Sequence, residues 1–211
     1  MDLFDEVLPR KQALVPGAFL LRGFALAEEA MLLAELHRIL QQAPLRSMLT
    51  PMGMMSVKTS SCGDFGWVSD RSGYRYSVDD PDNQRSWPLI PACFLHLAQT
   101  AAVEAGYKNF VPDSCLINQY PIGAGMGLHQ DKNERDFTQP IVSVSLGVAA
   151  VFQFGGLKRS DKTIRIPLVH GDVVVWGQES RLRYHGVLPI KASSHPAFGE
   201  QRINLTFRKA G

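Results

Sequence analysis

Residues 128–132 read Leu-His-Gln-Asp-Lys, and a second histidine follows much later in Tyr184-His185-Gly186. His129 and Asp131 are two residues apart, so on a β-strand their side chains point to the same face. His185, arriving from a distant strand, can complete three ligands on one side of a metal ion. Two histidines and one carboxylate are the facial triad of non-haem Fe(II) oxygenases, which leaves the opposite positions open for a chelating co-substrate and O2.

A structural zinc site is the alternative interpretation of these three residues. Such sites usually have four protein ligands, often including cysteines, and no fourth ligand is apparent in the sequence. The pattern therefore favours the oxygenase. We interpret the remaining histidines as surface, packing or structural residues: His37, His96, His170 and His195.

Residues 201–208 read Gln-Arg-Ile-Asn-Leu-Thr-Phe-Arg and alternate with a period of two. Arg202, Asn204 and Arg208 therefore share one strand face. Two inward-facing arginines are costly without an anionic partner, and guanidinium groups bind carboxylates through paired hydrogen bonds. This strand predicts a site for a small dicarboxylate. Asn118 and Tyr120 also share a strand face, and they either end a strand or bind the same ligand.

Length and composition indicate one globular domain with a sizeable core: 211 residues, 45% hydrophobic and 20% charged. A net charge of +2 neither requires nor excludes nucleic acid. Three widely spaced cysteines without a Cys-x-x-Cys motif argue against a disulfide scaffold and favour a reducing compartment. The first six residues include three acids, not a basic stretch before an apolar run, and no membrane span is visible. We therefore expect a cytoplasmic protein.

Hydrophobic patterning predicts a short strand over 18–22 and helices over 28–42 and 91–105, with hairpins and loops over 47–75. Beyond Ser114 the pattern predicts eight short strands, over 115–120, 127–131, 141–146, 151–154, 163–168, 172–176, 184–188 and 202–208. We expect an α+β, mainly β fold: a double-stranded β-helix, or cupin-like jelly roll, braced by two helices. Residues 91–211 would form this core, and residues 1–90 an extension of the same domain that folds over the barrel mouth.

Further segments extend the pattern in order along nearly the whole chain: SCGDFGW (61–67), GYRY (73–76), LINQYPIGAG (116–125), VSVSLG (142–147), FQFGGLKR (152–159) and HGDVVVWGQESR (170–181). With LHQDK, YHG and RINLTFR, they resemble the AlkB family of bacterial alkylated-DNA repair dioxygenases. The resemblance implies Fe(II), 2-oxoglutarate and O2 as requirements. It also implies oxidative removal of N-alkyl lesions such as 1-methyladenine and 3-methylcytosine, releasing formaldehyde and succinate.

The resemblance also implies a role for each site residue. The iron ligands would be His129, Asp131 and His185, and the 2-oxoglutarate pocket would contain Asn118, Tyr120, Arg202, Asn204 and Arg208. Arg202 would pair with the distal carboxylate and Arg208 would lie near the metal-bound end. Trp67 would stack on a flipped-out base, Tyr74 would hold the base or a phosphate, and Arg159 would border the base pocket. The residues alone favour a packing anchor, a hairpin cap and a solvated charge for these three positions.

Four positions depart from the family pattern, and one of them is a residue missing around Met52–Met55. Asn133 replaces an aspartate at the base edge, Thr59 replaces a methionine near the base, and Gly125 replaces a basic residue that faces phosphate. The Asn133 amide keeps a hydrogen-bond acceptor but loses a charge, so we expect a weaker preference for cationic lesions. Strand binding would then depend more on the basic residues Lys58, Arg71, Arg75, Lys132 and Arg159.

The expected substrate is alkylated single-stranded DNA, with duplex DNA and RNA left open, and the expected state is a monomer. Two other functions are compatible with parts of the pattern. One is the same chemistry on a small molecule or protein side chain, which needs no base platform. The other is a catalytically silent module that only binds nucleic acid.

Overall fold

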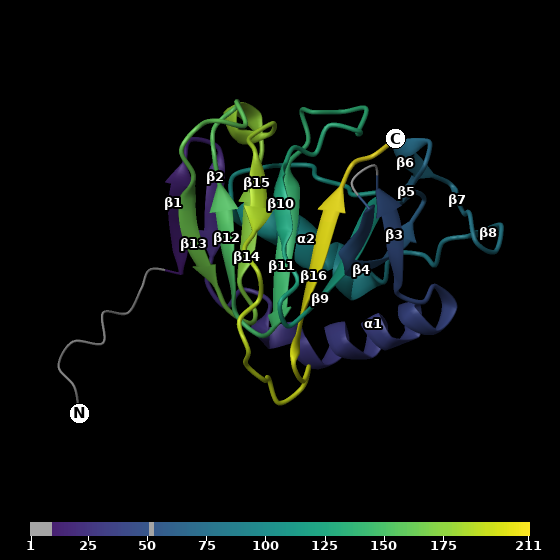
Figure 1. Ribbon diagram of the computed structural model, residues 1–211. Helices are drawn as coiled ribbons and strands as arrows, with labels where there is room; N and C mark the ends of the chain where they lie inside the picture. Colours follow the sequence, from purple (N-terminus) through teal and green to yellow (C-terminus); the bar gives the residue numbers. More distant parts are fainter. Residues whose placement is uncertain (1–9, 51–52) are drawn as a thin grey trace.

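Two antiparallel sheets pack face to face in the computed structural model, which describes residues 10–50 and 53–211 (Figure 1). The larger sheet contains, in spatial order, β1 (Lys11–Val15), β2 (Ala18–Leu21), β14 (Val173–Trp176), β11 (Ile141–Gly147), β16 (Gln201–Arg208), β9 (Ser114–Pro121), β4 (Gly53–Gly63) and β3 (Arg46–Thr50). The smaller sheet contains β10 (Met126–His129), β15 (His185–Val187), β12 (Ala150–Phe154) and β13 (Ile164–Leu168). The mainly β jelly roll expected from the sequence is confirmed.

All the strands predicted beyond Ser114 are present, and one of them ends early. β10 stops at His129, so the predicted continuation of this strand to Asp131 is wrong. Side chains connect the segment beyond it to residues 181–182: Arg181 Nη1 donates to the Asp131 carbonyl at 2.8 Å, and the Gln130 side chain donates from Nε2 to the Leu182 carbonyl at 2.6 Å. Side-chain hydrogen bonds here take the place of a neighbouring strand.

Two helices cover the outer face of the larger sheet. α1 (Glu29–Gln42) buries Leu32, Leu36 and Ile39, a spacing that forms one helical stripe. α2 (Ala92–Glu104) starts after Pro91 and buries its own stripe, including Phe94 and Leu97. These side chains form one core with the outward-facing residues of the larger sheet, and a second core fills the space between the sheets. Short 3-10 turns lie at Leu26–Glu28 and Gln178–Ser180.

Segments from before residue 90 extend the larger sheet at both edges. β2 pairs with β14, and β4 pairs with β9, so much of the expected extension is sheet and not a cover over the barrel mouth. The hairpin of β5 (Gly66–Asp70) and β6 (Gly73–Ser77) is separate from this sheet, as is the small ribbon of β7 (Asp79–Asp80) and β8 (Arg85–Ser86). The hairpin docks on Trp87, whose ring would lie 2.1 Å from a Cβ at Gly66, so only glycine fits there.

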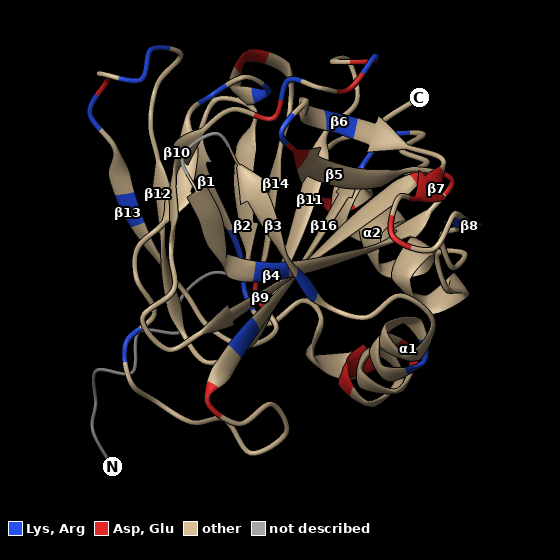
Figure 2. Ribbon diagram, turned by 45° about the vertical axis from the view of Figure 1, so that its right-hand side comes forward, with Lys and Arg blue, Asp and Glu red and all other residues tan. Residues whose placement is uncertain are grey.

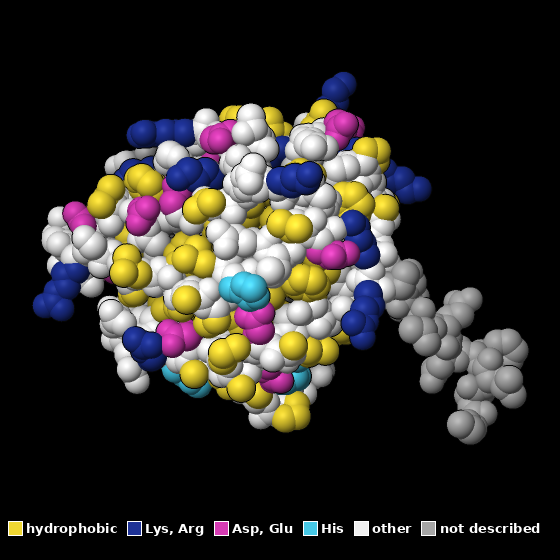
Figure 3. All heavy atoms as spheres, turned by 180° about the vertical axis from the view of Figure 1, so that it is seen from behind, with side chains coloured by type: hydrophobic (Ala, Val, Ile, Leu, Met, Phe, Trp, Pro, Cys, Tyr) yellow, Lys and Arg dark blue, Asp and Glu magenta, His cyan; other side chains and the backbone are white. Residues whose placement is uncertain are grey.

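Charged residues lie mostly on the loops and edges. Figure 2 shows that many Lys and Arg positions lie on the loops at the top of the barrel and on β6. Figure 3 shows the molecule from behind relative to Figure 1, and this face mixes apolar with charged side chains. Exposed apolar residues of the helices include Met31 and Val103. Among residues 10–50 and 53–211, no helix is long and apolar enough to span a membrane. The three N-terminal acids, Asp2, Asp5 and Glu6, lie outside the described residues.

Candidate active site

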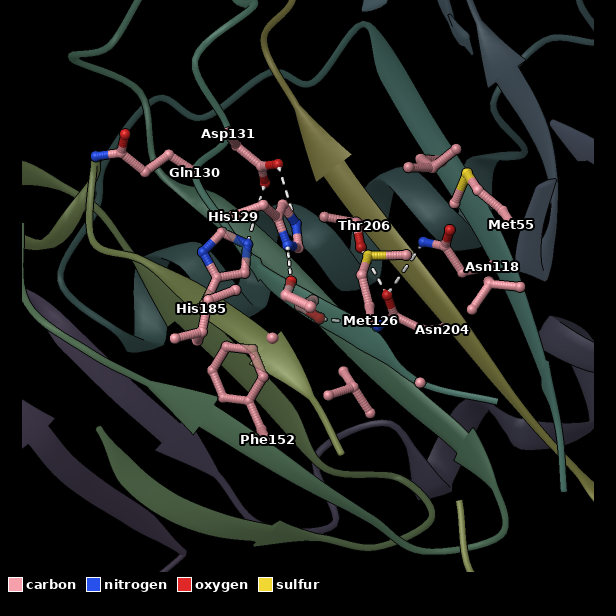
Figure 4. Close-up of a pocket in the computed structure, with 18 of the residues that line it drawn as sticks. Met55, Asn118, Met126, His129, Gln130, Asp131, Phe152, His185, Asn204 and Thr206 are labelled. Carbon is pink, nitrogen blue, oxygen red and sulfur yellow. Dashed lines mark hydrogen bonds and ion pairs between the residues drawn. The ribbon is translucent and has the colours of Figure 1, made fainter. Parts of the chain in front are cut away.

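The three predicted metal ligands meet between the sheets (Figure 4). His129 at the end of β10 is the register partner of His185 at the start of β15. His129 Nε2 lies 3.8 Å from Asp131 Oδ1, and His185 Nε2 lies 3.7 Å from Asp131 Oδ2. The ligand atoms of all three residues lie within 4.8 Å of one another. The structure therefore brings together the triad that the sequence indicates.

Hydrogen bonds to the backbone set the tautomer of both imidazole rings. Nδ1 of His129 lies 2.9 Å from the Gly127 carbonyl, and Nδ1 of His185 lies 3.0 Å from the Arg183 carbonyl. Because a carbonyl can only accept, each Nδ1 carries the proton and each Nε2 presents a lone pair towards Asp131. Burial, with His129 as the next cause, lowers the pKa of His185 to about 4. The neutral, metal-binding form is therefore favoured at neutral pH.

Asp131 is held in its charged form by an arginine. Arg208 donates from Nε and Nη2 to Asp131 Oδ2, at 3.0 and 2.8 Å. Burial alone would raise the pKa of Asp131, but Arg208 and the two histidines outweigh burial and hold this pKa well below its usual range. One carboxylate and two neutral imidazoles are a donor set that suits Fe(II).

Arg202 has buried donors that no described residue accepts. Its side chain is only 2% exposed, Nη2 donates to Ser145 Oγ at 3.0 Å, and its guanidinium lies 5.0 Å from the centre of the Tyr120 ring. Nε and Nη1 of Arg202, and Nη1 of Arg208, are buried without a partner among the described residues. Unsatisfied buried donors are costly, so this pocket fits an anionic ligand such as a dicarboxylate.

Asn118 and Asn204 are register partners on β9 and β16, but their amides differ. The side-chain amide of Asn204 forms its hydrogen bonds within the protein. Its nitrogen donates to Ser143 Oγ and to the Val144 carbonyl, and its oxygen accepts from Thr206. The buried Oδ1 of Asn118 has no partner among the described residues. Asn204 therefore orders the pocket wall, and Asn118 has capacity left for a ligand.

A cavity of about 430 Å³ extends from the triad to the β5–β6 hairpin. Trp67, Tyr74, Asn133 and Arg159, which come from separate segments, all line it. The Trp67 and Tyr74 rings stack with centroids 5.5 Å apart and an interplanar angle of 18°. The structure thus places these four residues on the cavity that also contains the triad.

The profile of the 2OG-Fe(II) oxygenase superfamily matches residues 17–208. This chain belongs to the 2OG-Fe(II) oxygenase superfamily. Among curated proteins it is 54% identical to the alpha-ketoglutarate-dependent dioxygenase AlkB of Salmonella typhimurium and 51% identical to that of Escherichia coli, in each case over 100% of this chain and 98% of the relative. Among solved structures, OsALKBH1 has a TM-score of 0.82 at 26% identity, over 94% of this chain and 99% of that chain. Members of this superfamily use Fe(II), 2-oxoglutarate and O2, which fits the donor set and the anionic pocket.

Two of the departures noted in the sequence have a structural explanation in this oxygenase. Thr59 is fully buried in β4 opposite Asn118 and does not line the cavity, so its expected place beside the base is wrong. Gly125 does line the cavity, but a Cβ there would lie 2.9 Å from the Val187 carbonyl and 3.0 Å from Pro189 N. The close approach of the 187–189 backbone therefore excludes a long basic side chain at this position.

The basic residues expected to bind phosphate differ in their surroundings. Lys58, Arg71, Lys132 and Arg159 are exposed. Arg75 is also exposed but forms an ion pair with Asp70 at 2.7 Å. The loop residues Lys132 and Arg159 flank the oxygenase cavity most directly, since Arg159 lines it and Lys132 follows Asp131.

Three residues near Asp131 were missed by sequence reasoning: the partly buried Tyr76 and the buried Glu134 and Arg181. Glu134 and Arg181 are 6% and 3% exposed, and Glu134 contacts both Tyr76 and Arg181. The signal that could have found them was their place inside or next to recognised motifs, since Arg181 closes HGDVVVWGQESR and Glu134 follows LHQDKN. They come from separate turns, so no periodicity groups them.

Two other histidines form a second cluster with a carboxylate. Glu29, His170 and His195 also have ligand atoms within 4.8 Å of one another. Nδ1 of His170 accepts the backbone N–H of Gly147 at 3.0 Å, so its neutral ring carries the proton on Nε2, 3.3 Å from Glu29 Oε1. Nδ1 of His195 accepts the N–H of Ala197 at 3.3 Å. These contacts support the structural interpretation of both histidines.

Proposed function

We propose that this protein is an Fe(II)- and 2-oxoglutarate-dependent dioxygenase that repairs N-alkylated nucleobases, such as 1-methyladenine and 3-methylcytosine, by oxidative dealkylation. The proposal rests on one observation: a single cavity contains a triad of possible metal ligands, arginine donors that have no hydrogen-bond partner among the described residues, and a hairpin with two stacked aromatic rings. The triad and arginines support the oxygenase chemistry, and the hairpin supports a planar substrate.

Each pocket residue has an assigned task. His129, Asp131 and His185 hold one face of the iron. Arg202 binds the distal carboxylate of 2-oxoglutarate through its free Nε and Nη1, with Tyr120 and Asn118 beside it. Arg208 keeps Asp131 ionised and has Nη1 left for the metal-bound end of the co-substrate. Asn204 orders the wall between them.

Iron, 2-oxoglutarate and O2, when bound, supply the oxidation that hydroxylates the N-methyl carbon, giving succinate, CO2 and a hydroxymethyl group that leaves as formaldehyde. The protein must bring that carbon to the metal and keep it there. A base inside a duplex stack cannot reach a site between two sheets, so it must be flipped out or come from a single strand. Unstacking costs less in a single strand, which favours alkylated single-stranded DNA.

The aromatic hairpin provides the platform for this base. Trp67 stacks on it, and a ring that carries a positive charge gains a cation–π contribution of about 0.5–2 kcal/mol. Tyr74 and Arg159 border the base or an adjacent phosphate, and Asn133 meets the base edge. We assign the β5–β6 hairpin as the nucleotide-recognition lid within residues 1–90, and residues 91–211 as the dioxygenase core.

We further propose that the enzyme works as a monomer in the reducing cytoplasm, which the free cysteines Cys62, Cys93 and Cys115 support. DNA is proposed as the substrate, with RNA as a second one that the same cavity can admit. The basic loops around the barrel mouth would contact phosphates of either (Figure 2).

The decisive experiment incubates the protein with Fe(II), 2-oxoglutarate and an oligonucleotide that carries a single 1-methyladenine. Mass spectrometry should show loss of the methyl group, with formaldehyde released. Trp67→Ala should lose this activity and still bind Mn(II) and 2-oxoglutarate, whereas Leu89→Ala, a change at an exposed apolar residue outside the cavity, should stay active. Turnover unaffected by Trp67→Ala would favour a small-molecule or protein hydroxylase, and lesion binding without turnover would favour a silent binding module.

A further inference from the structure

We propose that Glu134 is a positioning residue for the metal ligand Asp131, and that its hydrogen bond with Tyr76 links the β5–β6 hairpin to the metal centre. The positioning role depends only on the triad holding a metal. The link to the hairpin rests on the proposed function, because it requires the hairpin to bind nucleic acid.

Glu134 lies between the hairpin and two arginines. Its Oε1 accepts a hydrogen bond from the Tyr76 hydroxyl at 2.6 Å and lies 3.5 Å from Arg208 Nε. Its Oε2 lies 3.1 Å from Arg181 Nη2. The Glu134 and Arg181 side chains are 2% and 3% exposed, so solvent screens these contacts little.

The two arginines that meet at Glu134 hold Asp131 at both ends. Arg181 Nη1 donates to the Asp131 carbonyl at 2.8 Å, and Arg208 donates twice to the Asp131 carboxylate. Asp131 lies beyond the end of β10, so no strand pairing fixes its position. Arg181 and Arg208 fix the position of Asp131 instead. Asp131 balances the charge of one arginine, and Glu134 balances the charge of the other. A neutral side chain at position 134 would leave an excess buried positive charge, and both arginines would shift.

Tyr76 extends the same network to the hairpin. It is the register partner of Trp67 across the β5–β6 pair, and directly opposite residues share a face of the ribbon. Tyr74, two residues earlier on β6, lies on that face too and stacks on Trp67. The side of the hairpin that carries the proposed base platform is therefore hydrogen-bonded, through Tyr76, to the group that positions Asp131.

Two linked sites must influence each other equally. If the hairpin position and the Asp131 position are coupled, Mn(II) with 2-oxoglutarate should tighten oligonucleotide binding, and the oligonucleotide should tighten the combined binding of Mn(II) and 2-oxoglutarate by the same factor. Mn(II) serves as a redox-inert probe, so neither measurement depends on turnover.

The first test measures Mn(II) affinity by calorimetry without nucleic acid. We expect Glu134→Gln to bind Mn(II) about 10–100-fold more weakly than the unaltered protein, the range typical when a partner of a metal ligand is lost. Tyr107→Phe removes a hydrogen bond of 2.6 Å to the Gly17 carbonyl, outside the Glu134 network, and should leave the Mn(II) affinity unchanged. Unchanged Mn(II) affinity in Glu134→Gln overturns the positioning role.

The second test measures the affinity for an oligonucleotide with one 1-methyladenine, with and without Mn(II) and 2-oxoglutarate. The unaltered protein and Tyr107→Phe should show the same tightening, within the range of about 5–150-fold that coupled sites show. Tyr76→Phe should show a ratio near one. An unchanged ratio in Tyr76→Phe, or an equal loss in Tyr107→Phe, overturns the link. If the unaltered protein binds no oligonucleotide while Glu134→Gln still loses Mn(II) affinity, the nucleic-acid function and the link fail and the positioning role stands.

Discussion

Two clusters among the described residues of this oxygenase have the same composition, two histidines and one carboxylate, and they differ in how their rings are placed to bind a metal. His129, Asp131 and His185 lie between the sheets, and Glu29, His170 and His195 lie where α1 begins and the turn before β14 packs on it. In both clusters the ligand atoms lie within 4.8 Å of one another. Proximity of suitable donors therefore does not separate them.

The backbone groups around the rings do separate them. The Nδ1 atoms of His129 and His185 face carbonyl oxygens, which leaves each Nε2 with a lone pair for a metal. The Nδ1 of His170 faces the N–H of Gly147, so its Nε2 carries a proton and donates towards Glu29. A metal at the second cluster would require a tautomer that sets two N–H groups against each other. The lesson is that the partner of the distal nitrogen decides what an imidazole can bind.

The largest expected difference between the clusters is in metal binding and turnover. Asp131→Ala should lose Mn(II) binding and dealkylation entirely, because it removes a ligand and both hydrogen bonds that Arg208 donates to the Asp131 carboxylate. Glu29→Ala should keep both, since it removes only a partly exposed hydrogen-bond acceptor. Calorimetric Mn(II) titration and formaldehyde release check both variants. A Glu29→Ala variant that folds but is inactive would contradict the difference between the two clusters.

A smaller effect is expected at the anionic pocket, which adjoins the first cluster. Arg202→Lys keeps the charge but loses the guanidinium fork, and hydrogen bonds between charged groups contribute about 1.5–3 kcal/mol. Because every 1.4 kcal/mol corresponds to a factor of about ten, the loss of such a hydrogen bond should raise the KM for 2-oxoglutarate about 10–100-fold. Arg22→Lys is the matched control near the second cluster, where Arg22 pairs with Asp172 at 2.7 Å, and its KM should not change. Steady-state kinetics in varied 2-oxoglutarate distinguish the two.

At the rim of the cavity, a single charge should change lesion preference only a few-fold. Asn133→Asp restores a negative charge beside a cationic base, and exposed charge pairs contribute about 0.2–1 kcal/mol. The rate ratio of 3-methylcytosine to 1-methylguanine should therefore increase. Competition assays with both lesions measure it, and an unchanged ratio refutes the role of Asn133 at the base edge.

The smallest expected effect is a pH dependence of stability at the second cluster. Burial, with His195 as the next cause, lowers the pKa of His170 below its ordinary 6.5. The unfolded chain then binds this proton first, so the stability contributed by neutral His170 is present above about pH 6.5 and is lost as pH falls through the lowered pKa. His170→Asn keeps an acceptor for Gly147 and removes the titration. Urea unfolding of metal-free protein at about pH 7.5 and about pH 5.5 should show a smaller loss in the variant; equal losses contradict it.

Periodicity and motif spacing were enough to predict the strands, the triad and the arginine face, because all three depend on which way side chains point along a strand. They failed where position depends on contacts from distant segments. Asp131 lies past its strand, where Arg181 and Arg208 hold it. The tautomers of the first cluster depend on nearby sequence, because the carbonyl that faces Nδ1 of His129 or His185 belongs to the residue two positions earlier. The Gly147 contact of His170 has no such signal.

The division of the site between the two sheets has a mechanical consequence. His129 and His185 belong to the smaller sheet, and Arg202 belongs to the larger one. A bound metal ion and dicarboxylate would therefore connect the two sheets, and their binding free energy would add to the free energy of unfolding. Cells short of iron would then hold a looser protein that proteases digest sooner, so that metal supply would govern how long the enzyme persists as well as how fast it works.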